Sequence, residues 1–139
     1  MGPALTRQNY DAYMSSIEHP QETLGGGRWP TKDITMEDAK KDMTGEEARA
    51  KERKSFTYAA VTLDGKRELE CVYISPSRKQ GYDATVRMWV TKERFDLGFE
   101  EELLGTAKKF LGEKWPFGKV AYLGKDISQA DFRALPDKK

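Results

Sequence analysis

The segment from Thr91 to Glu102 holds the residue types that bear most directly on ligand chemistry. It contains the basic residues Lys92 and Arg94 and a single glycine, Gly98. It lies between a predicted strand and a predicted helix, where free backbone N–H groups commonly bind anions. The acidic residues at positions 100–102 complement the helix dipole but would repel such an anion. At about 6 Å and an effective dielectric near 20, one carboxylate costs a phosphate roughly 2–3 kcal/mol.

The other reactive residue types are few and have structural explanations. His19 is the only imidazole, and its place at the end of a predicted helix accounts for it. Cys71 is the only cysteine, so no intrachain disulfide forms, and a reducing cytoplasm is the expected location. Its alternating context predicts a small core residue rather than a nucleophile. Gly25–Gly27 precedes no strand–helix pattern and predicts a mobile connection rather than a phosphate loop. The sequence shows no metal-ligand spacing.

A strand–helix–strand pattern must position the segment around Gly98. Within Ala84–Val90, apolar residues alternate with Thr85, Arg87 and Trp89, which predicts a strand with Arg87 and Trp89 on one face. From Phe99 onward an apolar stripe with helical spacing follows. Pro116 lies just past the end of this helix, and 119–123 predicts a second strand. Two parallel strands joined by a right-handed crossover are expected.

The N-terminal part predicts two helices. Apolar spacing indicates a helix over Asn9–Glu18, which Pro20 would end, and a loop over 21–31. Thr35 and Asp38 have the spacing of a capping box, which predicts the start of a second helix. Gly45 costs about 1 kcal/mol against alanine inside a helix, so a break near residue 44 is open.

The middle of the chain predicts a meander of strands. Phe56–Leu63 and Glu68–Ser75 are rich in β-branched and aromatic residues, and Asp64-Gly65 predicts the turn between them. The strand Ala84–Val90 follows after a short connection. Beyond Leu123 the chain is polar, with a few apolar residues that could pack against the core, and 136–139 is expected to fray.

Composition restricts the classes of function. The chain has 139 residues, of which 34% are charged and 37% apolar, and a single domain over residues 1–139 is expected. The formal net charge of +1 gives no electrostatic case for nucleic acid. No apolar run approaches the roughly 20 residues that span a bilayer, and no secretory leader is visible. No nucleic-acid or membrane partner is therefore expected.

The order of predicted elements resembles that of the GNAT-type N-acetyltransferases. Local sequences also resemble a bacterial acetyltransferase-like group: Tyr13–His19, Arg28–Pro30, Phe56–Tyr58, Cys71–Ile74 and Trp115–Phe117. The resemblance covers about residues 5–123. It implies an α+β fold in which helices flank a mostly antiparallel sheet with one parallel strand–helix–strand unit.

The resemblance also implies where a cofactor would lie. In this superfamily the strand matching Ala84–Val90 pairs with the pantetheine arm of acetyl-CoA, and amides of the next loop cradle the diphosphate. The implied cofactor-binding residues are Trp89, Val90, Thr91, Arg94 and Gly98. The family loop has Gln or Arg, two residues, Gly, one residue, then Gly or Ala. A register starting at Arg94 puts Leu97 and Phe99 at the small positions, and one starting at Phe95 puts Glu100 at the last.

The family's chemistry is direct acyl transfer to an amine. Tyr122 is the implied general acid, and Glu70 and Asp83 are the implied bases. For Tyr122, packing as a core or rim aromatic is the favoured explanation. For Glu70 and Asp83, solvation at strand edges explains the carboxylates as well as a catalytic role does. Two functions remain open. One is acetyl-CoA-dependent transfer to a small-molecule or peptide amine. The other is a non-catalytic GNAT-fold module that binds a ligand or a protein, a homodimer partner included.

Overall fold

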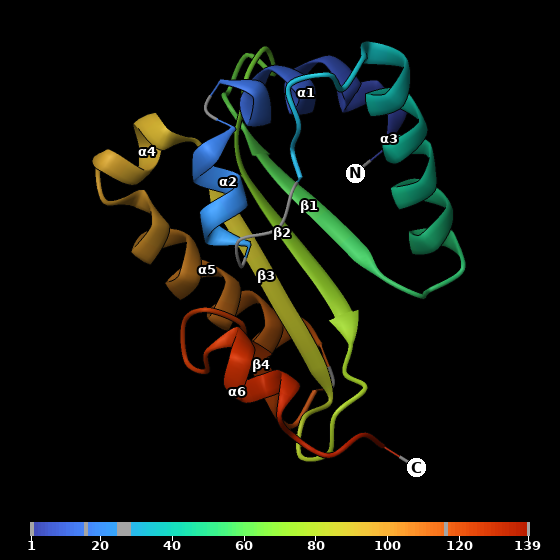
Figure 1. Cartoon of the computed structure of the whole chain (residues 1–139), viewed down its shortest axis with the longest axis vertical. Coiled ribbons are helices and arrows are strands. Elements are labelled where there is room, and N and C mark those ends of the chain that lie inside the picture. Colours follow the sequence, from blue (N-terminus) through green and yellow to red (C-terminus); the bar gives the residue numbers. More distant parts are fainter. Residues whose placement is uncertain (1, 16, 25–28, 116, 139) are drawn as a thin grey trace.

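The computed structural model describes residues 2–15, 17–24, 29–115 and 117–138. Helices come first in the chain, three consecutive strands follow, and a long helix then leads to a fourth strand, in the order that the sequence predicts (Figure 1). The elements in chain order are η1 (Pro3–Leu5), α1 (Thr6–Met14), α2 (Glu18–Thr23), α3 (Met36–Lys51), β1 (Phe56–Val61), β2 (Glu68–Pro76), β3 (Ala84–Val90), α4 (Lys92–Asp96), α5 (Phe99–Lys114), β4 (Val120–Tyr122) and α6 (Gln129–Arg133).

The strands form one four-stranded mixed sheet in the order β1-β2-β3-β4. β1 pairs with β2 and β2 with β3 in antiparallel fashion, while β3 and β4 are parallel. Parallel neighbours require a crossover, and α5 supplies it. The α+β class and the parallel strand–helix–strand unit are therefore confirmed.

Helices cover both faces of the sheet. α5 packs its buried Leu103, Ala107 and Leu111 against one face, which carries Val86 and Met88 of β3. On the opposite face, α1 packs against the buried side chains of Cys71 and Trp89. α6 packs on Ala121 and Leu123 of that same face, and Figure 1 shows it beside β4 at the far end from α1 and α3. The sequence pattern gave the faces of β3 correctly, because Trp89 lies opposite Val86 and Met88.

The two predicted helices near the N-terminus are shifted or extended. α1 ends at Met14, and Pro20 lies inside α2 rather than ending a helix. Pro20 is tolerated there because the N–H groups of a first helical turn have no intrahelical partner anyway. The predicted loop over 21–31 is wrong at its start, because α2 continues to Thr23. Gly25–Gly27 lies outside the described residues.

α3 begins as the sequence predicts and does not break. The Thr35 hydroxyl accepts a hydrogen bond from the Asp38 amide, and the Asp38 carboxylate accepts one from the Thr35 amide, both at 3.1 Å. The helix continues through Gly45 to Lys51. Packing of α3 against α1 and β1, through the buried Ala39 and Met43, outweighs the low helix propensity of one glycine.

Two polar segments are more ordered than expected. The run after Thr91 forms the short helix α4, in which Lys92 and Asp96 pair at 2.7 Å, and Ser128 caps α6.

The expected fraying at 136–139 is wrong for the part of this segment that the structure describes. The Pro136 carbonyl accepts a hydrogen bond from the Gln80 amide at 2.8 Å, and the Lys138 amide donates one to the Arg78 carbonyl at 2.8 Å. None of the described helices is both long and apolar enough to cross a bilayer.

The packing of α5 leads to a stability prediction with an internal control. Leu111 is 2% exposed inside the α5 core, whereas Leu97 is 66% exposed. We expect Leu111→Ala to lower the free energy of unfolding by about 2–5 kcal/mol, because it leaves a cavity that the core cannot fully close. Leu97→Ala should change it by less than about 0.5 kcal/mol. Urea denaturation of both variants is the measurement, and equal losses would contradict this assignment of the core.

Candidate functional site

The carboxyl end of β3 extends well beyond its pairing with β4. The parallel register covers only Ala84–Val86 of β3, and the last contact is a hydrogen bond of 3.0 Å from the Leu123 amide to the Val86 carbonyl. On its other side β3 stays paired with β2 as far as Val90. The two parallel strands therefore part after Val86, and β3 runs on with a ladder on one side only.

The parting leaves backbone groups of β3 without a partner strand. Successive residues of a strand point their N–H and C=O groups to opposite sides within the sheet. Because the Val86 carbonyl faces β4, the backbone groups of Met88 and Val90 face the same side. No strand in the described part of the chain pairs with them there. Both residues are buried, and a buried unpaired amide is a position that a ligand or water commonly satisfies.

Comparison with known proteins supports one fold. No protein-family model matches the sequence, and no curated protein matches it. Among solved structures, a ribosomal-protein-S5-alanine acetyltransferase from Vibrio fischeri superimposes with a TM-score of 0.61 at 12% identity, covering 81% of this chain. A Vibrio cholerae protein assigned as a ribosomal-protein-serine acetyltransferase superimposes with a TM-score of 0.55 at 9% identity, covering 82% of this chain. This chain has the GNAT fold. It spans 61% of the length of each of these two structures.

The loop that holds the diphosphate in the GNAT superfamily has its amides occupied here. The Arg94 amide donates to the Thr91 hydroxyl at 3.4 Å, and the Phe95 amide donates to the Thr91 carbonyl at 2.9 Å. The amides of Leu97 and Gly98 donate to carbonyls of α4, at 3.2 and 2.9 Å. Folding of α4 thus consumes the donors that would otherwise face a phosphate.

The first turn of α5 keeps its amides but carries negative charge. Gly98, with φ of 82°, takes the N-cap position without a side-chain cap. The next residues in the helix include Glu100, Glu101 and Glu102. Glu100 forms an ion pair with Lys125, which joins this turn to the loop after β4. Phosphate binding at this helix start would have to overcome the remaining carboxylates.

Arg94, an implied phosphate ligand, is turned toward the protein. Its guanidinium carbon lies 3.7 Å from the centre of the Phe99 ring, and Nη2 lies 3.9 Å from a Glu70 carboxylate oxygen. Arg94 Nε is buried with no hydrogen-bond partner among the described residues. The side chain therefore stacks on Phe99 and pairs only weakly with Glu70.

Glu70 lies on β2, across the paired edge of β3 and level with its carboxyl end. It is the antiparallel partner of Val90, so it points to the α5 face, toward Arg94. Burial raises the pKa of the Glu70 carboxyl, and the nearby Arg94 guanidinium partly opposes this shift. A raised pKa brings a carboxylate nearer to the range in which it can take a proton from a substrate at neutral pH.

Tyr122 and Asp83 do not join Glu70 in one cluster. Tyr122 is the register partner of Val86, where β3 and β4 still pair, and burial raises the pKa of its phenol. The Asp83 carboxylate accepts hydrogen bonds from the Gly118 and Lys119 amides at 2.6 and 3.1 Å, which lower its pKa. Asp83 precedes β3, roughly 20 Å along the strand from Val90. Its described contacts are those of an anchor for the start of β4.

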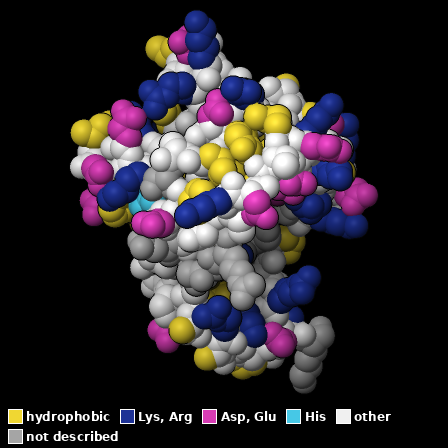
Figure 2. All heavy atoms as spheres, turned by 45° about the horizontal axis from the view of Figure 1, so that its top comes forward, with side chains coloured by type: hydrophobic (Ala, Val, Ile, Leu, Met, Phe, Trp, Pro, Cys, Tyr) yellow, Lys and Arg dark blue, Asp and Glu magenta, His cyan; other side chains and the backbone are white. Residues whose placement is uncertain are grey.

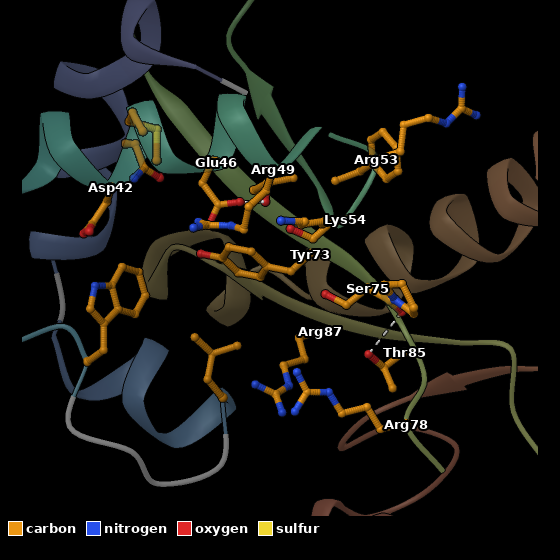
Figure 3. Close-up of a pocket in the computed structure, with 18 residues that line it drawn as sticks. Asp42, Glu46, Arg49, Arg53, Lys54, Tyr73, Ser75, Arg78, Thr85 and Arg87 are labelled. Carbon is orange, nitrogen blue, oxygen red and sulfur yellow. Dashed lines mark hydrogen bonds and ion pairs between the residues drawn. The ribbon is translucent and has the colours of Figure 1, made fainter. Parts of the chain in front are cut away.

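A cleft of about 1030 Å³ lies on the face of the sheet opposite α5. Strand residues Tyr73, Ser75 and Thr85 line its floor, and the carboxyl-terminal half of α3 forms one wall (Figure 3). Arg78 and Arg87 line the cleft from the sheet side. The sequence analysis did not single out this cleft, because its walls come from three segments that only the fold brings together.

A buried carboxyl group on the α1 side also escaped sequence analysis. Glu68, the first residue of β2, is 2% exposed, and neither carboxyl oxygen has a hydrogen-bond partner among the described residues. Burial raises the pKa of Glu68 from 4.5 to about 8. In the sequence, Glu68 is a charged residue at the start of a predicted strand, directly after a polar turn. Nothing in this local pattern indicates a buried acid.

The raised pKa predicts how stability depends on pH. Between pH 4.5 and about 8 the folded protein keeps a proton on Glu68 that the unfolded chain has released. Unfolding then releases a proton, so the free energy of unfolding should fall as pH rises through this window, by up to a few kcal/mol. We expect Glu68→Gln to remove most of that decrease, measured by urea denaturation at pH 5, 6.5 and 8.

The exposed Glu113→Gln is the matched control, because it removes the same group from a solvated position. It should keep the decrease of the unmodified protein. Parallel pH profiles for Glu68→Gln and Glu113→Gln would contradict a protonated Glu68 in the folded protein.

Proposed function

We propose that the protein transfers an acetyl group from acetyl-CoA to the amine of a small molecule or a peptide. The free edge of β3 at Met88 and Val90, in a GNAT fold, is the observation that carries this proposal. An extended pantetheine arm can add to a strand edge through backbone hydrogen bonds. Both solved neighbours are named as ribosomal-protein acetyltransferases, which supports a peptide amine among the acceptors.

The reaction itself needs little from the protein besides placement and polarisation. The amine nitrogen attacks the thioester carbonyl carbon, the C–S bond breaks, and the amine loses a proton while the thiolate of CoA gains one. An amide of Met88 or Val90, facing the arm, would stabilise the negative charge on the carbonyl oxygen. Of the three implied strand residues, Val90 would hold the arm, together with Met88, because the Thr91 amide donates to the Leu69 carbonyl of β2 at 3.0 Å and the backbone groups of Trp89 face β2 as well. Arg94 and Gly98 would lie nearest the phosphates.

Glu70 is the better supported of the two implied bases. Its pairing with Val90 places it at the same end of β3 as the unpaired groups, one strand away from the free edge and on the α5 face, and its raised pKa suits a proton acceptor. Asp83 is at the other end of β3 and already accepts two backbone hydrogen bonds. Tyr122 remains the implied acid for the leaving thiolate, since its raised pKa keeps the phenol protonated at neutral pH.

A second candidate function is a non-catalytic GNAT-fold module that binds another ligand or a protein. The amides of α4 that already donate hydrogen bonds within the segment favour this alternative, because they are not available to a diphosphate. The Glu100–Lys125 ion pair also joins α5 to the loop after β4 at the carboxyl ends of the two parallel strands. In this alternative the fold persists while acetyl-CoA binding has been lost.

Calorimetric titration with acetyl-CoA separates the two candidates. Under the first, the unmodified protein binds acetyl-CoA at or below about millimolar concentration and releases free CoA when amine acceptors are added. We expect Glu101→Gln to tighten binding by about tenfold or more, because it removes a charge from the first turn of α5. Glu113→Gln, at the far end of the same helix, should leave the affinity unchanged.

The outcomes are distinct for each candidate. No binding by the unmodified protein at millimolar acetyl-CoA would remove the proposal of acetyl transfer. Tight binding that Glu101→Gln weakens would remove the non-catalytic alternative. Replacement of both Leu97 and Phe99 by glycine tests the same loop, and it should create or strengthen binding if side chains now occupy a degenerate phosphate site.

A further inference from the structure

Two arginines of the cleft opposite α5 have no acidic partner in the part of the chain that the structure describes. Arg78, after β2, and Arg87, in β3, both line the cleft and are exposed. Across the described residues, no carboxylate lies within ion-pair distance of either guanidinium. Figure 3 shows their side chains extending into the cleft toward one another. Two like charges pointing into one space repel each other, and a bound anion would relieve that repulsion.

The segment that carries Arg78 is held in place on both sides. The Ser77 amide donates to the Asp83 carbonyl at 3.1 Å, and the Arg78 carbonyl accepts from the Lys138 amide at 2.8 Å. The next residue, Lys79, is neutralised by Asp137 at 2.6 Å. The C-terminal segment thus fixes the backbone at Arg78 and satisfies its basic neighbour, while the Arg78 side chain is left for the cleft.

The opposite wall adds positive charge. Arg49 and Lys54, from the end of α3 and the residues after it, also line the cleft. Arg49 is paired with Glu46 at 2.7 Å, and Glu46 also accepts a hydrogen bond from the Thr57 hydroxyl. Asp42 is the other acidic residue among the described ones that line the cleft, and Figure 3 places it at the far end from Arg78 and Arg87.

The concentration of cations is local to the cleft. Among the described residues, five basic side chains line it against two acidic ones, although the whole chain has a net charge of only +1. Figure 2 shows Lys or Arg and Asp or Glu side chains interspersed over the face it displays, with neither sign dominating. An excess of one charge in a concave site raises the local concentration of ligands of the opposite charge.

We propose that this cleft binds a small molecule that carries a phosphate group, held by Arg78 and Arg87. A guanidinium presents paired N–H donors that match two phosphate oxygens, and a phosphate carries enough charge for two arginines. The hydroxyls of Ser75 and Thr85 on the floor, where the Thr85 hydroxyl lies 3.5 Å from the Ser75 carbonyl, offer further polar contacts. The volume of about 1030 Å³ accommodates a ligand larger than the phosphate itself.

This site is separate from the one proposed for acetyl-CoA. The cleft lies on the sheet face opposite α5, whereas the diphosphate of acetyl-CoA would lie at the start of α5. Binding of a phosphate compound to the cleft requires no acetyl transfer. The inference therefore goes beyond the proposed function and can be tested without any cofactor.

Inorganic pyrophosphate is the probe, titrated at low ionic strength into the unmodified protein and two variants of equal net charge. Arg78→Gln/Arg87→Gln removes both proposed contacts. Lys40→Gln/Lys41→Gln removes two exposed charges from α3 that do not line the cleft. We expect the arginine variant to lose at least about tenfold in affinity and the lysine variant to stay within about twofold.

Amide chemical shifts of the unmodified protein give a second measurement that does not depend on how the variants fold. Pyrophosphate should shift the amides of Ser75, Thr85 and Arg87 and leave those of Glu100 and Glu101 in place. Equal weakening in the two variants, no binding at millimolar pyrophosphate, or shifts confined to the start of α5 would each overturn the inference. The last of these would also redirect the anion site to α5.

Discussion

The separation of β3 from β4 after Val86 is the constraint on which the rest of the site depends. β4 has only three residues, so its parallel ladder ends while β3 continues for four more residues beside β2. A buried strand edge cannot remain unpaired without cost unless something else satisfies its amides. Two contacts on the sheet face opposite α5 hold this end of β3 in place. The Trp89 indole donates a hydrogen bond of 2.9 Å to the Tyr73 hydroxyl, and α1 packs on Trp89. The free edge is thus a consequence of rigid packing and unequal strand lengths.

Charge decides what this edge and the cleft can hold. At the end of β3, α4 turns its amides inward, Arg94 stacks on Phe99, and the first turn of α5 is acidic. Each of these features disfavours binding of a diphosphate. None of them changes the unpaired edge of β3, which would bind the thioester arm. On the other face, Arg78 and Arg87 form no ion pair with any carboxylate of the described residues and point into a concave space. Three acidic residues thus lie at the helix start where a cofactor phosphate is expected, whereas the two arginines of the cleft lie on the other face of the sheet.

Much of the fold follows from local sequence signals. The alternation in Ala84–Val90 correctly predicts the two faces of β3, and the spacing of Thr35 and Asp38 correctly predicts the start of α3. Both signals depend only on residues close together in the chain. The prediction that Pro20 ends a helix is wrong because proline is accepted in the first turn of a helix as well as just beyond its last turn. α4 was missed because its five residues include one apolar side chain, Phe95, which is too few to show helical periodicity. Its signal lies in the Thr91 cap and the Lys92–Asp96 pair instead.

The sites were less accessible from sequence for a different reason. The implied residues Glu70 and Val90 do meet at the end of β3, because strand pairing brings them together. Asp83 does not join them, since position within the strand rather than residue type decides where a carboxylate lies. The convergence of Arg78 and Arg87 depends on the hairpin between β2 and β3, on α3 and on the C-terminal segment at once. Burial of Glu68 likewise depends on how α1 covers the start of β2, which no local pattern encodes.

The central claim is that the free edge of β3 receives the thioester arm while the α4–α5 loop contributes little to phosphate binding. The most direct test is an NMR titration of isotopically labelled protein with S-acetylpantetheine, which has the arm but no diphosphate. We predict chemical-shift changes at the amides of Met88 and Val90, and an affinity within a few-fold of that for acetyl-CoA. Absence of shifts at these two amides, or an affinity for acetyl-CoA that exceeds that for S-acetylpantetheine a hundredfold, would contradict the account.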